Sequence, residues 1–160
     1  MVQVIPGILN PTEAQELLNM TPKNRSNNSF SNKIVQKVAK SYQSKIDNQV
    51  FVMEKPSYWR LESRPRGHKW HYDGCKEVDG KLVDNHMAWC KIGSTTLLTP
   101  HDQFTGGELT FKQQDKNFQI KDHYLNGVMY SAGKHDNPSM HKVEKHSGNR
   151  TVLLMFFATT

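Results

Sequence analysis

The sequence has few cysteines and no long apolar run. Its two cysteines, Cys75 and Cys90, show no CxxC spacing and are too few for a disulfide framework. We therefore expect two free thiols, as in a reducing compartment. No apolar stretch reaches the roughly 20 residues that a bilayer span requires, and the opening MVQVIPGILN lacks the basic start of a secretory signal. These absences predict a cytoplasmic protein without a membrane span.

The chain also lacks a block of like charges, because its lysines are scattered singly. The formal net charge of +6 permits an acidic ligand, either a small dicarboxylate or a nucleic acid. However, no aromatic-rich basic strand face is visible, so nucleic acid is not expected as a partner. A length of 160 residues corresponds to one domain with enough chain for a hydrophobic core.

Residues 1–48 are predicted to be mainly helical after a short opening strand. Asn10 precedes Pro11, and Glu13 follows Asn10 by three residues, which is the arrangement of a helix N-cap with a capping box. A second helix is expected to begin near Ser31, since apolar residues then recur at helical spacing. Its buried stripe comprises Ile34, Val35, Val38, Tyr42 and Ile46.

Residues 49–160 are predicted to form strands. Eight short segments are rich in branched or aromatic residues and bounded by turn formers: VFVMEK, SYWRLESR, MAWCKIGSTTLL, ELTF, NFQIK, GVMYSA, HKVEK and RTVLLMFFA. Strands at this spacing without helices between them are typical of a sandwich, jelly roll or barrel. We predict a single domain over residues 1–160, in which two helices support a β core.

Three residues could form a metal site. In WHYDG, His71 and Asp73 are two apart, so on a strand both point to the same side. They could be an ordinary surface pair, or they could join His141, which begins a later strand. Two histidines and one carboxylate with open positions form the ligand set of non-haem Fe(II) oxygenases. His68 is a rival ligand, but three residues from His71 on a strand it is expected to point away.

Arg150 is the second unusual feature. The last strand places four alternating residues on one face: Arg150, Val152, Leu154 and Phe156. If the turn centres on HSGN, Arg150 lies across from about Val143 and roughly 7 Å along the strand from His141. A buried arginine requires an anionic partner, because an unpaired buried charge is costly. That partner could be Glu108 or Glu144, or one end of a dicarboxylate whose other end binds the metal.

Several motifs occur in a specific order. HYD is followed by FTGGELTF, then by GVMYSAGKHDNPSMHKV, and then by GNR, with the arginine nine residues after the histidine. On these motifs, residues 58 to 158 resemble the 2-oxoglutarate- and Fe(II)-dependent oxygenases of the prolyl 4-hydroxylase-like branch. The stretch LLTPHDQFTGGEL is especially similar to bacterial and viral members.

The resemblance implies a double-stranded β-helix, a jelly roll with supporting N-terminal helices. His71, Asp73 and His141 would bind Fe(II), and Arg150 would bind the far carboxylate of 2-oxoglutarate. Many prolyl hydroxylases place a tyrosine on the strand before the GGE loop, whereas this chain has STTLL. We therefore expect Thr95 or Thr96 to supply the hydroxyl that helps to bind the co-substrate. Ascorbate is a further candidate cofactor.

The implied activity is hydroxylation of a peptidyl residue, proline first, with decarboxylation of 2-oxoglutarate to succinate and CO2. Another amino acid, a nucleobase or a small metabolite is an alternative substrate, and a non-catalytic metal-binding jelly roll is an alternative function. We expect a monomer that acts on a protein or peptide. Residues 74–86, a long polar loop containing glycine, are the candidate substrate lid.

Two further groups of residues receive simpler interpretations. Gly106 and Gly107 are expected to form only a turn between strands. Five histidines are interpreted as loop and surface residues: His86, His101, His123, His135 and His146.

Overall fold

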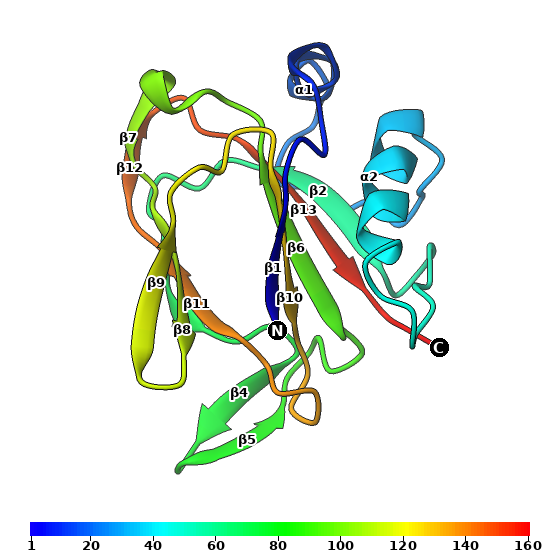
Figure 1. Cartoon of the computed structure of the whole chain (residues 1–160), viewed down its shortest axis with the longest axis vertical. Helices are drawn as coiled ribbons and strands as arrows, with labels where there is room; N and C mark the ends of the chain where they lie inside the picture. The colour runs from blue at the N-terminus through cyan, green and yellow to red at the C-terminus, as the bar shows by residue number, and fades with distance from the viewer.

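The computed structural model describes all 160 residues and consists mainly of antiparallel strands (Figure 1). Two helices, α1 (Pro11–Leu18) and α2 (Lys33–Gln43), lie in the N-terminal part. The capping box at α1 forms, since the Glu13 amide donates to Asn10 Oδ1 at 2.8 Å and the Asn10 amide donates to Glu13 Oε1 at 3.0 Å. Neither helix is long and apolar enough to cross a membrane.

The major sheet has five strands and separates the helices from the minor sheet (Figure 1). Its strand order is β1 (Val2–Ile5), β10 (Gly127–Ser131), β6 (Ile92–Leu97), β13 (Val152–Phe157) and β2 (Tyr58–Glu62). On the helix side, Leu153 and Met155 of β13 join the main buried cluster together with Val38 and Tyr42 of α2. The amphipathic pattern of α2 is thus explained by burial against this sheet.

The minor sheet faces the other side of the major sheet. Its strand order is β3 (His68–His71), β11 (Met140–Val143), β8 (Leu109–Gln113) and β9 (Lys116–Ile120). Two smaller sheets complete the structure: β7 (Phe104–Gly106) with β12 (His146–Gly148), and β4 (Cys75–Val78) with β5 (Lys81–Asp84). A 3-10 helix, η1 (His101–Gln103), precedes β7. Two facing antiparallel sheets match the predicted jelly roll in outline.

Two expectations about local structure are wrong. VFVMEK does not form a strand, because Phe51 makes only an isolated bridge to Thr159. Residues 74–86 are not an open loop, since β4 and β5 form a hairpin within them. Its two turn residues, Asp79 and Gly80, have φ of 50° and 78°, as a two-residue hairpin turn with positive φ at both positions requires.

We predict that Leu153→Ala lowers the free energy of unfolding by about 2–5 kcal/mol, because Leu153 is buried in the main cluster and truncation leaves a cavity. Urea denaturation measures this change. The control is Val78→Ala in the hairpin, where the side chain is 44% exposed and the expected change is within about 0.5 kcal/mol. Equal effects of the two variants would contradict this description of the core.

Candidate metal centre

A pocket of about 310 Å³ lies between the two sheets. The major sheet contributes alternate residues of β13, and the predicted face of Arg150, Val152, Leu154 and Phe156 lines the pocket as a whole. The minor sheet contributes His71 from β3 and His141 from β11. Nine of its 20 lining residues are apolar or aromatic, and most of the others carry polar or ionisable side chains, so the pocket suits a ligand with charged groups.

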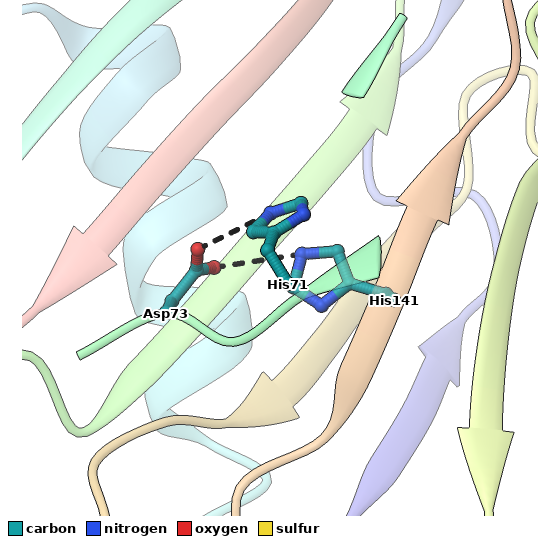
Figure 2. Close-up of side chains that lie close together, drawn as sticks. All are labelled: His71, Asp73 and His141. Atoms are coloured by element: carbon teal, nitrogen blue, oxygen red, sulfur yellow. Dashed lines mark ion pairs between the residues drawn. The ribbon is translucent and has the colours of Figure 1, made fainter. Parts of the chain in front are cut away.

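His71, Asp73 and His141 converge in this pocket (Figure 2). Their potential ligand atoms all lie within 4.8 Å of one another. Asp73 Oδ1 lies 3.6 Å from His71 Nε2, and Asp73 Oδ2 lies 3.6 Å from His141 Nε2. The pairing of β3 with β11 explains this convergence, because His141 stands directly opposite His71 in the register.

Backbone carbonyls fix the orientation of both imidazoles. His71 Nδ1 donates to the Lys69 carbonyl at 2.7 Å, and His141 Nδ1 donates to the Ser139 carbonyl at 3.0 Å. Each Nε2 therefore faces the carboxylate. Burial, and then the charge of His141, lower the pKa of His71, which favours its neutral form. Histidines that bind metals commonly use the second ring nitrogen in this way, so the donor set fits a divalent transition metal.

Arg150 is 5% exposed and lacks an acidic partner. No carboxylate lies within 4.0 Å of its guanidinium, and its buried Nε has no hydrogen-bond partner. Burial lowers the pKa of Arg150, while the charges of Glu62 and Glu108 oppose that change without forming an ion pair. The predicted alternative of neutralisation by Glu108 or Glu144 does not occur, and Glu144 instead pairs with Lys142 at 2.8 Å. The pocket therefore contains a buried cation ready for an anion.

Gly107 does more than form a turn. It has a φ of +71°, and a Cβ at this position would lie 2.5 Å from Arg150 Cδ and 2.6 Å from Arg150 Nε. Any larger residue would therefore occupy the space of the arginine side chain. Gly106 has a φ of +79°, and a Cβ at this position would clash with the carbonyl oxygen of Lys145, the residue before β12.

Similarity to known proteins is found in structure and not in sequence. No family model matches the sequence, and no curated protein matches it. Solved structures do match. Viral collagen prolyl hydroxylase vCPH from Paramecium bursaria Chlorella virus-1, in its 2OG complex, superposes with a TM-score of 0.64 at 13% identity, covering 99% of this chain and 96% of that one.

Two cellular enzymes are similar to the same extent. A prolyl-4-hydroxylase from Pseudomonas putida gives a TM-score of 0.63 at 11% identity, covering 98% of this chain and 91% of that one. A prolyl hydroxylase in complex with a hypoxia inducible factor peptide fragment, from Trichoplax adhaerens, gives 0.61 at 12%, covering 98% and 81%. This chain has the prolyl hydroxylase fold. The fold thus agrees with the resemblance found in the sequence motifs.

In this prolyl hydroxylase fold, the predicted hairpin between β11 and the last strand does not form. β11 pairs with β3 and β8, whereas β13 pairs with β2 and β6 of the other sheet. Between them β12 pairs with β7, which carries the chain from one sheet to the other. Arg150 therefore does not lie across from Val143. It reaches the pocket from the segment just before β13.

The alternation of β6 separates the two candidate threonines. Thr95 lines the pocket. Thr96 points to the helix side, where its hydroxyl lies 2.9 Å from the hydroxyl of Tyr42. Thr95 is therefore the threonine placed to contact a pocket ligand.

The expectation for His68 is wrong. Its ring stacks on His71 with centroids 3.5 Å apart, and both residues line the pocket. β3 has a register shift in which His71 pairs with His141 while His68 pairs with Val143. Three residues along β3 therefore pair with two residues along β11. The extra residue in β3 changes the alternation of side chains, so His68 faces the same side as His71.

Two histidines expected at the surface are buried. His123 is 3% exposed, its Nε2 donates to the Thr95 carbonyl at 3.2 Å, and burial lowers its pKa to about 4. His146 is 8% exposed, and burial followed by the charge of Arg150 lowers its pKa. Their polar neighbours in the sequence gave no sign of burial, since it results from contacts with distant strands.

Tyr130 is a site residue that the sequence analysis missed. Its hydroxyl donates to Asp73 Oδ2 at 2.6 Å, and its ring lies 4.5 Å from that of His141. Burial and the charge of Asp73 raise the pKa of Tyr130 well above its usual value, so it remains a donor. Gly93 stands opposite it, and a Cβ there would lie 2.5 Å from the Tyr130 ring. The sequence pattern gave no sign of this role, because it depends on the register of β10 against β6.

We predict that Tyr130→Phe weakens Co(II) binding by about tenfold, because the hydrogen bond to the carboxylate of the candidate ligand Asp73 is lost. Isothermal titration calorimetry measures the affinity. Tyr42→Phe is the matched control, since it also removes a buried phenol hydroxyl but lies on the helix side of the sheet. Unchanged Co(II) affinity in Tyr130→Phe would show that the hydrogen bond does not act on the metal site.

Proposed function

We propose that the protein is a 2-oxoglutarate- and Fe(II)-dependent oxygenase that hydroxylates a residue of a protein or peptide, with proline as the first candidate. One observation carries the proposal: the buried, unpaired Arg150 lines the same pocket as the His71–Asp73–His141 cluster. A metal site alone fits many functions. A metal site together with a buried guanidinium fits a co-substrate that has a metal-chelating end and a carboxylate end.

In this proposal His71, Asp73 and His141 hold Fe(II), while Arg150 and Thr95 bind the far carboxylate of 2-oxoglutarate. When bound, Fe(II) supplies the redox chemistry by which O2, 2-oxoglutarate and a substrate C–H bond become succinate, CO2 and an alcohol, with one oxygen atom in succinate and one in the alcohol. Apolar residues of the pocket exclude water around the reactants: Leu109, Val143, Val152, Leu154 and Phe156. Ascorbate is proposed only as a reductant that keeps the iron ferrous.

The peptide substrate is supported by the solved structure in which a prolyl hydroxylase of this fold holds a peptide fragment. The β4–β5 hairpin, which starts two residues after Asp73, is our proposed cover for such a peptide. The test measures succinate formed from 2-oxoglutarate with Fe(II), ascorbate and O2, with and without proline-rich peptides. Peptide-stimulated succinate with a gain of one oxygen atom on the peptide supports the proposal. Bound iron without any succinate would favour a non-catalytic metal-binding protein.

We expect His141→Ala to abolish Fe(II) binding and turnover, because it removes one of three ligands, while the far-UV circular dichroism spectrum is retained. Equilibrium dialysis with Fe(II) under anaerobic conditions measures the binding. His135→Ala removes an exposed histidine outside the pocket and serves as the control. Full turnover by His141→Ala would exclude His141 as a ligand.

Arg150→Gln is expected to raise the 2-oxoglutarate concentration for half-maximal rate by about 100-fold, because a buried charged partner of the carboxylate is removed. Gly107→Ala should act in the same direction by displacing the guanidinium. Fe(II) affinity should be unchanged in both variants. The control is Arg25→Gln, an exposed arginine outside the pocket. Unaltered 2-oxoglutarate dependence in Arg150→Gln would rule out the carboxylate contact.

A further inference from the structure

The pocket contains more charge than the metal and the co-substrate require. Five of its lining residues are ionic: Arg60, Glu62, Arg64, Asp73 and Arg150. In the proposed function, on which this inference rests, Asp73 and Arg150 are already used. Arg60 is paired with Glu62, since Arg60 Nη2 lies 2.7 Å from Glu62 Oε1. Arg64 therefore remains as a cation of the pocket that has no carboxylate within 4.0 Å.

Arg64 is held beside the metal cluster by a histidine. Its Nη1 lies 3.0 Å from His68 Nδ1, and because a guanidinium only donates, Nδ1 must accept. The hydrogen of the neutral His68 ring is then on Nε2, which remains a donor. The ring stacks on His71 with an interplanar angle of 16°. Arg64 is therefore connected to the proposed iron ligand through one intervening ring, although its own side chain is exposed.

Arg60 adds a further hydrogen-bond donor without an acceptor to this part of the pocket. The buried Nε of Arg60 has no hydrogen-bond partner. On another part of the pocket wall, Tyr58, Met87 and Phe156 form an apolar and aromatic surface. The pocket thus combines a region suited to a hydrocarbon group with a region suited to an anion, and no lysine lines it.

We propose that Arg64 and His68 bind a carboxylate of the substrate that lies next to the residue being hydroxylated. One carboxylate matches the single unpaired positive charge of Arg64, and the planar guanidinium suits its geometry. The carboxylate could belong to an acidic side chain beside the reacting residue or to the C-terminus of a peptide. Both sources present the same chemistry to the site, and substrate choice between acidic and neutral peptides would then depend on Arg64.

The test uses the full chain with Fe(II), 2-oxoglutarate and short end-blocked peptides in which glutamate, glutamine or lysine adjoins proline. A second pair of peptides ends in a free carboxylate or an amide. We expect kcat/KM to be about fivefold higher for a carboxylate peptide than for its neutral isostere, which is the upper range for an exposed ion pair. The preference should decrease as salt is raised. A preference for glutamate over glutamine identifies a side-chain carboxylate as the ligand. A preference for the free C-terminus over the amide identifies the C-terminal carboxylate.

Arg64→Glu should reverse the preference in favour of the lysine peptide, while Fe(II) and 2-oxoglutarate affinities stay unchanged. His68→Phe, which keeps an aromatic ring against His71 but removes the acceptor for Arg64, should reduce the preference. Lys116→Glu is the matched control, because it makes the same charge change at an exposed site outside the pocket.

Equal kcat/KM for all peptides, or an unaltered preference in Arg64→Glu, would overturn the carboxylate site and leave the hydroxylase intact. If no peptide raised succinate above the rate without substrate, the peptide substrate of the proposed function would itself be wrong, and the carboxylate site would be withdrawn with it.

Discussion

The pairing of β3 with β11 is the constraint on which the candidate site depends. It places His71 opposite His141, although 70 positions of the chain separate them, and Asp73 lies two residues beyond the end of β3. The Cα atoms of directly opposite residues on antiparallel strands lie within about 5.5 Å, and their side chains point to the same face. The register therefore brings the two imidazoles together. The carbonyls of Lys69 and Ser139 then determine which ring nitrogens face Asp73.

The site also depends on two opposite charges that are kept apart in the pocket. Arg150 and Asp73 both lie in the pocket, yet they do not form an ion pair with each other. Their separation leaves one negative and one positive group for two different ligand ends. Glycine makes this possible at two places, because Gly107 admits the Arg150 side chain and Gly93 admits the Tyr130 ring. The polar groups of the site thus depend on the absence of side chains at neighbouring backbone positions.

Much of the site could be predicted from sequence, for identifiable reasons. Short-range spacing correctly grouped His71 with Asp73 and Arg150 with Val152, Leu154 and Phe156, although Asp73 and Arg150 lie just outside β3 and β13 and not on these strands as expected. Register is not local. The hairpin proposed between β11 and β13 was wrong because β12 pairs elsewhere and shifts the chain to the other sheet. The hydrogen bond of Tyr130 to Asp73 spans 57 positions and likewise depends on pairings that the sequence pattern does not specify.

The extra residue in β3 has a consequence for the comparison of related chains. Side-chain direction in a strand follows the parity of the residue count, and the bulge changes that parity between His68 and His71. A relative that lost a single residue there would retain the HxD letters but would turn the position of His68 away from the pocket. The number of residues in β3 before HxD therefore determines whether the position of His68 faces the pocket.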